Sequence, residues 1–276
     1  MEKTEKCNWT IDELSSALVA PIRHAGNALP AGLVHIRILP THVISTSWHY
    51  YKNKQWDEDM SDVAIGFYNA SFRYPNGEAL YRCSMNRSPS LSCLGDTMNS
   101  FNSIANKVPT AGRSRKSRTA KATWPQWLQD YHGFYHCLAN FWVLPMGIGR
   151  GGCGLRVNRG ANAEKDFVDR HLHKVKNYHY GKPRSDDFTC DKCGNLGDYY
   201  GRFGEGEDGW RNFIKILCLE PYLNEDGDPV KLGGLEPEAF CITATALIRE
   251  RAKRIAARYE KALVSFFDPF VQQQSK

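Results

Sequence analysis

The sequence lacks any long hydrophobic run. Its longest apolar stretch, residues 141–148, contains a proline and a glycine, and it falls far short of the roughly 20 residues that cross a bilayer. The charged first residues lead into no apolar segment, so no secretory signal is expected either. These two absences argue against a membrane partner and predict a cytoplasmic protein.

A disulfide framework is also missing. The chain has nine cysteines, and their odd number and irregular spacing differ from the even sets of secreted disulfide scaffolds. In a reducing compartment they are expected to be free thiols or metal ligands.

The composition is that of an ordinary globular protein. The 276 residues are 42% apolar and 24% charged, which is enough to bury a substantial core. We expect one globular domain over residues 1–276. The net charge of +6 permits a nucleic-acid partner without requiring one.

The periodicity of apolar residues predicts an α+β fold, predominantly α-helical, with a small β element in the N-terminal third and a long C-terminal helix. A capping box at Thr10 and Glu13 begins the first helix, and Asn76 and Gly77 predict a turn. Strands are expected over residues 33–38, 42–51 and 79–83. Further helices are expected over residues 57–72, 95–104, 127–140, 163–178, 196–203, 210–219 and 237–267.

The last helix carries an apolar stripe with cations around it. The stripe consists of Ile248, Ala252, Ile255, Tyr259, Ala262 and Phe266. The remaining positions include Arg249, Arg251, Lys253, Arg254, Arg258 and Lys261. Over so short a run the stripe favours a helix packed on its own domain over a coiled-coil dimer.

Two segments predict contacts with an anionic partner. Residues 108–123 are rich in cations and small polar residues and read as a mobile basic loop, while the glycine-rich stretch 147–160 resembles a phosphate cradle. Neither a Walker A loop nor a dinucleotide fingerprint is present. A flexible turn and a solvated charge run are the alternatives. The candidate nucleic-acid contacts are Arg113, Arg115, Lys116, Arg150, Arg156 and Arg159.

A CxxCG knuckle is the strongest metal signal. Cys190 and Cys193 are two residues apart, so both thiolates can reach one zinc ion, and Gly194 permits the tight turn. His179 is our third candidate ligand. A second knuckle is absent, and other completions are His171, His173, Cys153 and Cys218. Two free cysteines in a surface loop are the alternative.

An acid–base cluster precedes the knuckle. Asp166, Asp169 and His173 fall at helical spacings of three and four, and a carboxylate beside an imidazole can act as a general base or hold a divalent ion. Ordinary ion pairs on a solvated helix are the more common explanation. No HExxH metal-binding pattern surrounds His132, His136 and Cys137. We therefore expect these three side chains to serve in packing.

The order of short motifs resembles an uncharacterised bacterial family known as a domain of unknown function. The matching pieces run from Pro75 to Phe213, and the family's Asp-Arg-Phe-Asp-Leu core is only partly kept, as Asp169-Arg-His-Leu172. Residues 139–144 and 248–251 also resemble the C-terminal part of His-Asn-His-type restriction endonucleases. Their upstream Asp/Glu-His-Ile-x-Pro segment is missing here, which puts that chemistry in doubt.

These features predict a nucleic-acid-associated bacterial or mobile-element protein, with phage defence or counter-defence as its setting. Two alternatives stay open: a metal-dependent hydrolase or nuclease, and a protein-interaction module that acts through the C-terminal helix. The sequence does not decide whether the chain is an enzyme.

Overall fold

A computed structural model describes residues 9–24, 33–39, 42–47, 59, 61–80, 93–112, 117–145, 167–182 and 199–272. This part of the chain has a predominantly helical α+β fold, as the sequence predicts. The α-helices are α1 Ile11–Leu18, α2 Asp62–Ser71, α3 Phe101–Ala105, α4 Gln126–Phe134, α6 Val168–His179, α8 Gly206–Ile216 and α9 Pro237–Gln272. The strands are β1 Ile22–His24, β2 Leu33–Leu39, β3 His42–Ser47, β4 Cys93–Thr97 and β5 Phe141–Pro145. The 3-10 turns are η3 Pro109–Ala111, η5 Lys121–Thr123, η6 Leu138–Asn140, η7 Gly201–Phe203 and η8 Glu220–Tyr222.

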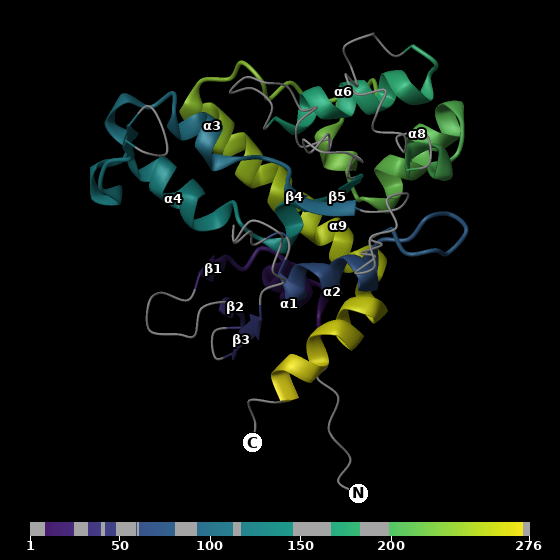
Figure 1. Cartoon of the computed structure of the whole chain (residues 1–276), viewed down its shortest axis with the longest axis horizontal. Helices are drawn as coiled ribbons and strands as arrows, with labels where there is room; N and C mark the ends of the chain where they lie inside the picture. Colours follow the sequence, from purple (N-terminus) through teal and green to yellow (C-terminus); the bar gives the residue numbers. More distant parts are fainter. Residues whose placement is uncertain are drawn as a thin grey trace, which may run out of the picture.

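Helix α9 crosses the middle of the molecule and packs against α1, α2, α3 and α4 (Figure 1). Of its predicted stripe, Ile248, Ala252 and Ile255 are fully buried, and the other three are half-buried. The stripe therefore packs within this chain. Tyr259 interrupts the helix with φ −115° and ψ 21°. No helix among the described residues is both long and apolar enough to cross a membrane.

Arg251 corrects the expectation that the cations of this helix lie outside its buried face. It lies one turn after Ile248 and is fully buried. Its Nε donates to the carbonyl oxygen of Leu217 at 3.0 Å, and its Nη1 donates to those of Ala139 at 2.6 Å and Phe141 at 2.8 Å. Burial lowers the pKa of the guanidinium from its ordinary value. A charged residue is expected from the sequence to be exposed. Arg251 instead lies in the core, where it joins three segments of the chain.

The first helix begins where the capping box predicts. The Oγ1 of Thr10 accepts from the backbone N–H of Glu13 at 3.2 Å, and the carboxylate of Glu13 accepts from the N–H of Thr10 at 2.8 Å. Just before it, the Nε1 of Trp9 donates to Asp268 at 2.8 Å, and the Trp9 ring lies 5.6 Å from that of Phe267. These contacts hold α1 against the end of α9.

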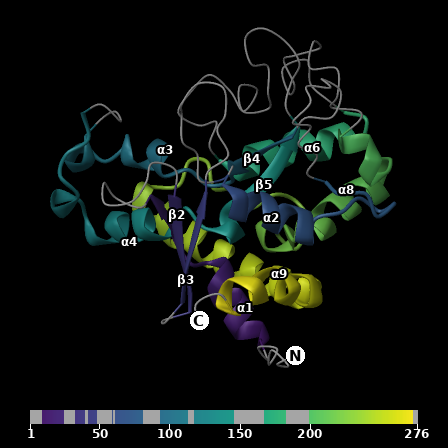
Figure 2. The same cartoon turned by 60° about the horizontal axis from the view of Figure 1, so that its bottom comes forward.

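The small N-terminal sheet is antiparallel with the order β1–β2–β3. Ile36 on the central strand is opposite Ile22 on one side and Ile44 on the other. Figure 2 shows β2 and β3 side by side near α1. This is the β element that the alternating pattern predicts.

The predicted helix over residues 95–104 is wrong in its first half. Residues 93–97 form β4, which pairs with β5 and places Asp96 opposite Trp142. The helix starts only at Phe101. A side chain at Gly95 would collide with the backbone of Asp59 and the hydroxyl of Tyr68, so this strand needs a glycine to fit the core. Long-range pairing overrides the local helix signal here.

The predicted helix over residues 127–140 ends early, at Phe134. The reason lies in Asn140, whose Nδ2 donates to the carbonyl oxygens of Tyr135 at 2.7 Å and Asn99 at 3.1 Å. Its Oδ1 accepts from the N–H of Asn99 at 3.2 Å. An asparagine that binds backbone groups in this way competes with helical hydrogen bonds.

The described parts of the basic segment 108–123 are held by hydrogen bonds. Arg118 donates to the carbonyl oxygen of Gly112 at 2.7 Å and to the side chain of Asn106 at 2.8 Å, and Ala111 is fully buried. Arg118 therefore holds the segment together. Residues 113–116 lie outside the described residues, and the mobility of the loop stays a prediction.

Candidate functional site

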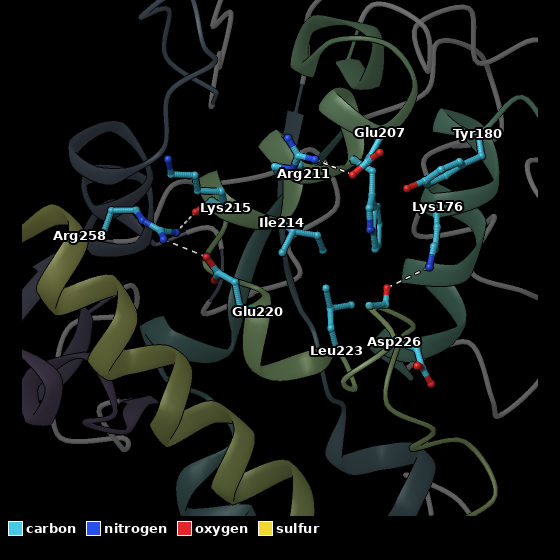
Figure 3. Close-up of a pocket in the computed structure, with 12 residues that line it drawn as sticks. Lys176, Tyr180, Glu207, Arg211, Ile214, Lys215, Glu220, Leu223, Asp226 and Arg258 are labelled. Carbon is cyan, nitrogen blue, oxygen red and sulfur yellow. Dashed lines mark hydrogen bonds and ion pairs between the residues drawn. The ribbon is translucent and has the colours of Figure 1, made fainter.

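Helices α6, α8 and α9 and the turn after α8 line a groove of about 490 Å3 (Figure 3). Apolar side chains of Trp210, Ile214 and Leu223 contribute to its lining. Tyr180, which is 41% exposed, lines it as well. The charged residues around it are Lys176, Glu207, Arg211, Lys215, Glu220, Asp226 and Arg258. This volume is in the range of small-molecule sites.

The end of α8 fixes one wall of this groove. The N–H of Leu219 donates to the carbonyl oxygen of Ile214 at 2.9 Å, and that of Cys218 donates to Lys215 at 3.2 Å. This is the Schellman arrangement, which requires a left-handed residue after the helix. Cys218 takes that place with φ 54°, although glycine is the usual residue there.

Three side chains of α9 bind the last carbonyl oxygens of α8. They pair as Arg258 with Lys215, Tyr259 with Ile216 and Arg251 with Leu217. Two of these donors are cations, and a cation at the C-terminal end of a helix also interacts favourably with its dipole. The wall that α8 contributes is therefore anchored to the central helix.

Most cations of the groove are already paired. The Nη2 of Arg258 donates to Glu220 at 2.9 Å, and the Nζ of Lys176 donates to Asp228 at 2.8 Å. Arg211 makes ion pairs with the carboxylates that precede it on α8. Lys215 alone among these cations makes no ion pair within the described residues. Because most charged side chains around the groove are paired with one another, the groove has little net charge with which to bind an anion.

A second hollow, of about 350 Å3, lies between η5, α4 and α9. We call it the α4–α9 hollow. It is lined by Lys121, Gln129, Asp130, Gly133, Phe134, Thr245 and Arg249. Neither Lys121 nor Arg249 makes an ion pair within the described residues, in contrast to most cations of the groove. The single lining carboxylate, Asp130, accepts from the Nε2 of Gln126 at 2.7 Å.

Contacts with neighbouring aromatic side chains fix the residues that line the α4–α9 hollow. The Nε1 of Trp124 donates to the hydroxyl of Thr119 at 3.1 Å, and its ring lies 5.3 Å from that of Phe101; these contacts fix the turn that carries Lys121. On the opposite wall, the guanidinium of Arg249 lies 5.2 Å from the ring centre of Phe134. Aromatic rings thus fix the turn that carries Lys121 and the guanidinium of Arg249.

The predicted acid–base cluster is not assembled by hydrogen bonds among the described residues. Asp166 lies outside them. Asp169 is buried, and its Oδ2 accepts from the backbone N–H groups of Leu232 and Gly233, each at 3.0 Å. His173 is exposed. The two N–H bonds give Asp169 a structural role, because they attach the loop before α9 to α6.

The predicted zinc ligands are only partly described. Cys190 and Cys193 lie outside the described residues, whereas His179 is buried at the end of α6. Burial lowers the pKa of His179 to about 4, so its imidazole is neutral at pH 7. The described residues contain no cluster of three or more potential metal ligands.

The other predicted chemical groups are used in packing where they are described. His171 lies 2.9 Å from the hydroxyl of Tyr200, and His132 lies edge-on to Phe101 at 4.7 Å. Cys137 is fully buried, and burial raises the pKa of its thiol to about 12. A thiol in this state is not a nucleophile at neutral pH.

The predicted nucleic-acid contacts Arg113, Arg115, Lys116, Arg150, Arg156 and Arg159 all lie outside the described residues. The sequence pattern did not reveal the α4–α9 hollow, since Lys121 and Arg249 belong to segments far apart in the chain. The only signal in the sequence was that both residues carry a positive charge.

No family model matches the chain, and no curated protein or solved structure shows significant similarity to it. The two resemblances in the sequence remain expectations, and the function has to be argued from the geometry.

Proposed function

We propose that this chain associates with nucleic acid through the exposed cations of α9. Lys253, Arg254 and Lys261 form what we call the cationic face of α9, and all three are exposed. The side chains of Lys253 and Arg254 are 63% and 44% exposed. Both share the single carboxylate of Glu250, at 3.8 Å and 3.6 Å. Exposed pairs of this kind contribute little stability, so these cations remain available to phosphates.

The spacing of this face suits a polyanion. Lys253 and Lys261 are eight residues apart, a separation that spans roughly 12 Å on a straight helix, and the irregular residue Tyr259 lies between them. Duplex DNA carries one charge per about 1.7 Å of its axis, so several phosphates fall within that span. The cationic face of α9 is the observation that carries the proposal, and the six cations predicted from the sequence stay candidate contacts beside it. Phage defence or counter-defence is the setting that we propose for it.

Fluorescence anisotropy with a labelled DNA strand tests the proposal. We expect binding to weaken linearly in a plot of log K against log salt concentration. The variant Lys253→Gln/Lys261→Gln should reduce the slope by about 1.4, since each phosphate contact with a single strand contributes about 0.7. The matched control is Lys182→Gln/Lys231→Gln, which removes two exposed lysines elsewhere and should leave the slope close to that of the parent protein.

Two results contradict the proposal. The first is an absence of binding at low salt. The second is an equal loss of slope in both double variants, because this would show that only net charge matters and that α9 is no binding surface.

A zinc site is a second proposal, and the state of His179 supports it. The side chain is buried and, within the described residues, its ring nitrogens have no side-chain hydrogen-bond partner, although a backbone hydrogen bond with Gly204 acts on its pKa. A neutral imidazole is the form that binds metal. With Cys190 and Cys193 it would supply three of the four ligands of a structural zinc.

A further inference from the structure

The α4–α9 hollow differs from the cationic face of α9 in shape as well as in position. The cationic face consists of exposed side chains along one helix, whereas the hollow is a recess whose walls come from η5, α4 and α9. A recess admits one chemical group, while an exposed helix face contacts a chain along its length. The two features therefore suit different parts of the same ligand.

We propose that this hollow binds the terminal phosphate of a nucleic-acid strand, an inference that rests on the proposed function. A phosphomonoester carries a charge of about −1.5 to −2 at pH 7, whereas an internal phosphodiester carries one negative charge. Lys121 and Arg249 together supply two positive charges to the hollow. Asp130 in the same lining lowers its net charge to +1, so the preference for a terminal group rests on the shape of the recess, which admits one chemical group.

Within the described residues neither cation makes an ion pair, so their donors can contact such a group. The ring of Phe134 attracts the guanidinium of Arg249 without using its N–H donors, and those donors match the geometry of phosphate oxygens. Thr245 lies one turn before Arg249 on α9 and also lines the hollow, so its hydroxyl adds a neutral donor on the same face.

Asp130 also lines the hollow, and its negative charge opposes the positive charges of Lys121 and Arg249. Its Oδ1 accepts from the amide of Gln126, which partly satisfies the carboxylate. With one acid against two cations, the lining keeps a net positive charge.

Three single-stranded oligonucleotides of one sequence test the inference: one with a 5′-phosphate, one with a 3′-phosphate and one with hydroxyl groups at both ends. Affinities are measured by competition against a labelled strand at one salt concentration. We expect one phosphorylated strand to bind about tenfold more tightly than the hydroxyl-ended strand. Either end supports the pocket, and the preference identifies which end enters it.

Substitutions then assign the preference to the hollow. Arg249→Gln and Lys121→Gln should each abolish the ratio between phosphorylated and hydroxyl-ended strands. Arg254→Gln is the matched control on the same helix: it should weaken all three strands and keep the ratio.

The outcomes separate this inference from the proposed function. Equal affinity of all three strands, together with salt-dependent binding, overturns the pocket and leaves nucleic-acid association intact. A ratio that survives Arg249→Gln and Lys121→Gln also overturns it. Failure of every strand to bind at low salt overturns the proposed function itself.

Discussion

Replacing Arg251 with methionine is the sharpest test of the fold. Methionine keeps the apolar stem of the side chain but removes the guanidinium that binds the carbonyl oxygens of Leu217, Ala139 and Phe141. The first of these oxygens ends α8, and the other two belong to η6 and β5. The substitution therefore removes the hydrogen bonds that join α9 to α8, η6 and β5 at one point.

The expected loss in the free energy of unfolding follows from the number of carbonyl oxygens that lose their hydrogen-bond donor. Each buried acceptor left without a partner costs about 1–3 kcal/mol. Removing the charge also removes the cost of burying the Arg251 guanidinium, which is several kcal/mol, so we take the lower end of that range. Three oxygens then give a loss of about 3 kcal/mol in the free energy of unfolding, from a total that is typically about 5–15 kcal/mol.

Urea denaturation followed by tryptophan fluorescence and circular dichroism measures this loss. Arg254→Met is the matched control, because Arg254 is exposed on the same helix and should change stability by no more than about 0.5 kcal/mol. Arg251→Lys should be intermediate, since a single ammonium group cannot bind all three oxygens with the planar fork of arginine. If Arg251→Met unfolds at the same urea concentration as the control, the three carbonyl oxygens do not depend on Arg251 and the reasoning is wrong.

Three further predictions concern the chemical groups. Elemental mass spectrometry of the purified protein should find about one zinc per chain, and Cys190→Ser/Cys193→Ser should lose it; an unchanged content would reject the knuckle as a site. Asp169→Asn should retain most of the stability, because its amide oxygen can still accept the two N–H bonds from the loop before α9; should the protein hydrolyse nucleic acid, unchanged turnover in this variant would remove Asp169 from the catalytic assignment. Burial raises the pKa of Cys137 from 9.0 to about 12 and that of Cys218 to about 11. The unfolded chain loses these protons at lower pH than the folded one, so stability should fall as pH rises above about 9, and mass spectrometry should find both thiols resistant to iodoacetamide until the protein unfolds.

The parts of the fold that the sequence predicts are those set by local chemistry. The capping box at Thr10 needs only Glu13, three residues later. The turn at Gly77 needs a residue that accepts a φ of 84°. The stripe of α9 needs only a repeat of three and four residues. Each of these signals is complete within a short window, so no knowledge of the rest of the chain is required.

The parts that the sequence misses depend on distant partners. Residues 93–97 are extended because β5 pairs with them, and α4 ends at Phe134 while Asn140 binds Asn99. The same holds for the candidate site, since Lys121 and Arg249 meet in one hollow only after α9 packs against α4. No window of sequence contains both members of these pairs.

The net charge of the sequence counts all cations equally. In the described residues, however, the cations differ in whether their hydrogen-bond donors are already used inside the fold. Arg118 binds a carbonyl oxygen and a side-chain amide of its own segment, and Arg251 and Arg258 bind the end of α8. These arginines contribute to the net charge of +6, yet their donors are used inside the fold. Within the described residues, Lys253 pairs only with the carboxylate of Glu250, and Arg249 makes no ion pair. Under the proposed function, the nucleic-acid surface would consist of the cations that the fold leaves unused, and the register of α9 decides which cations of this helix those are.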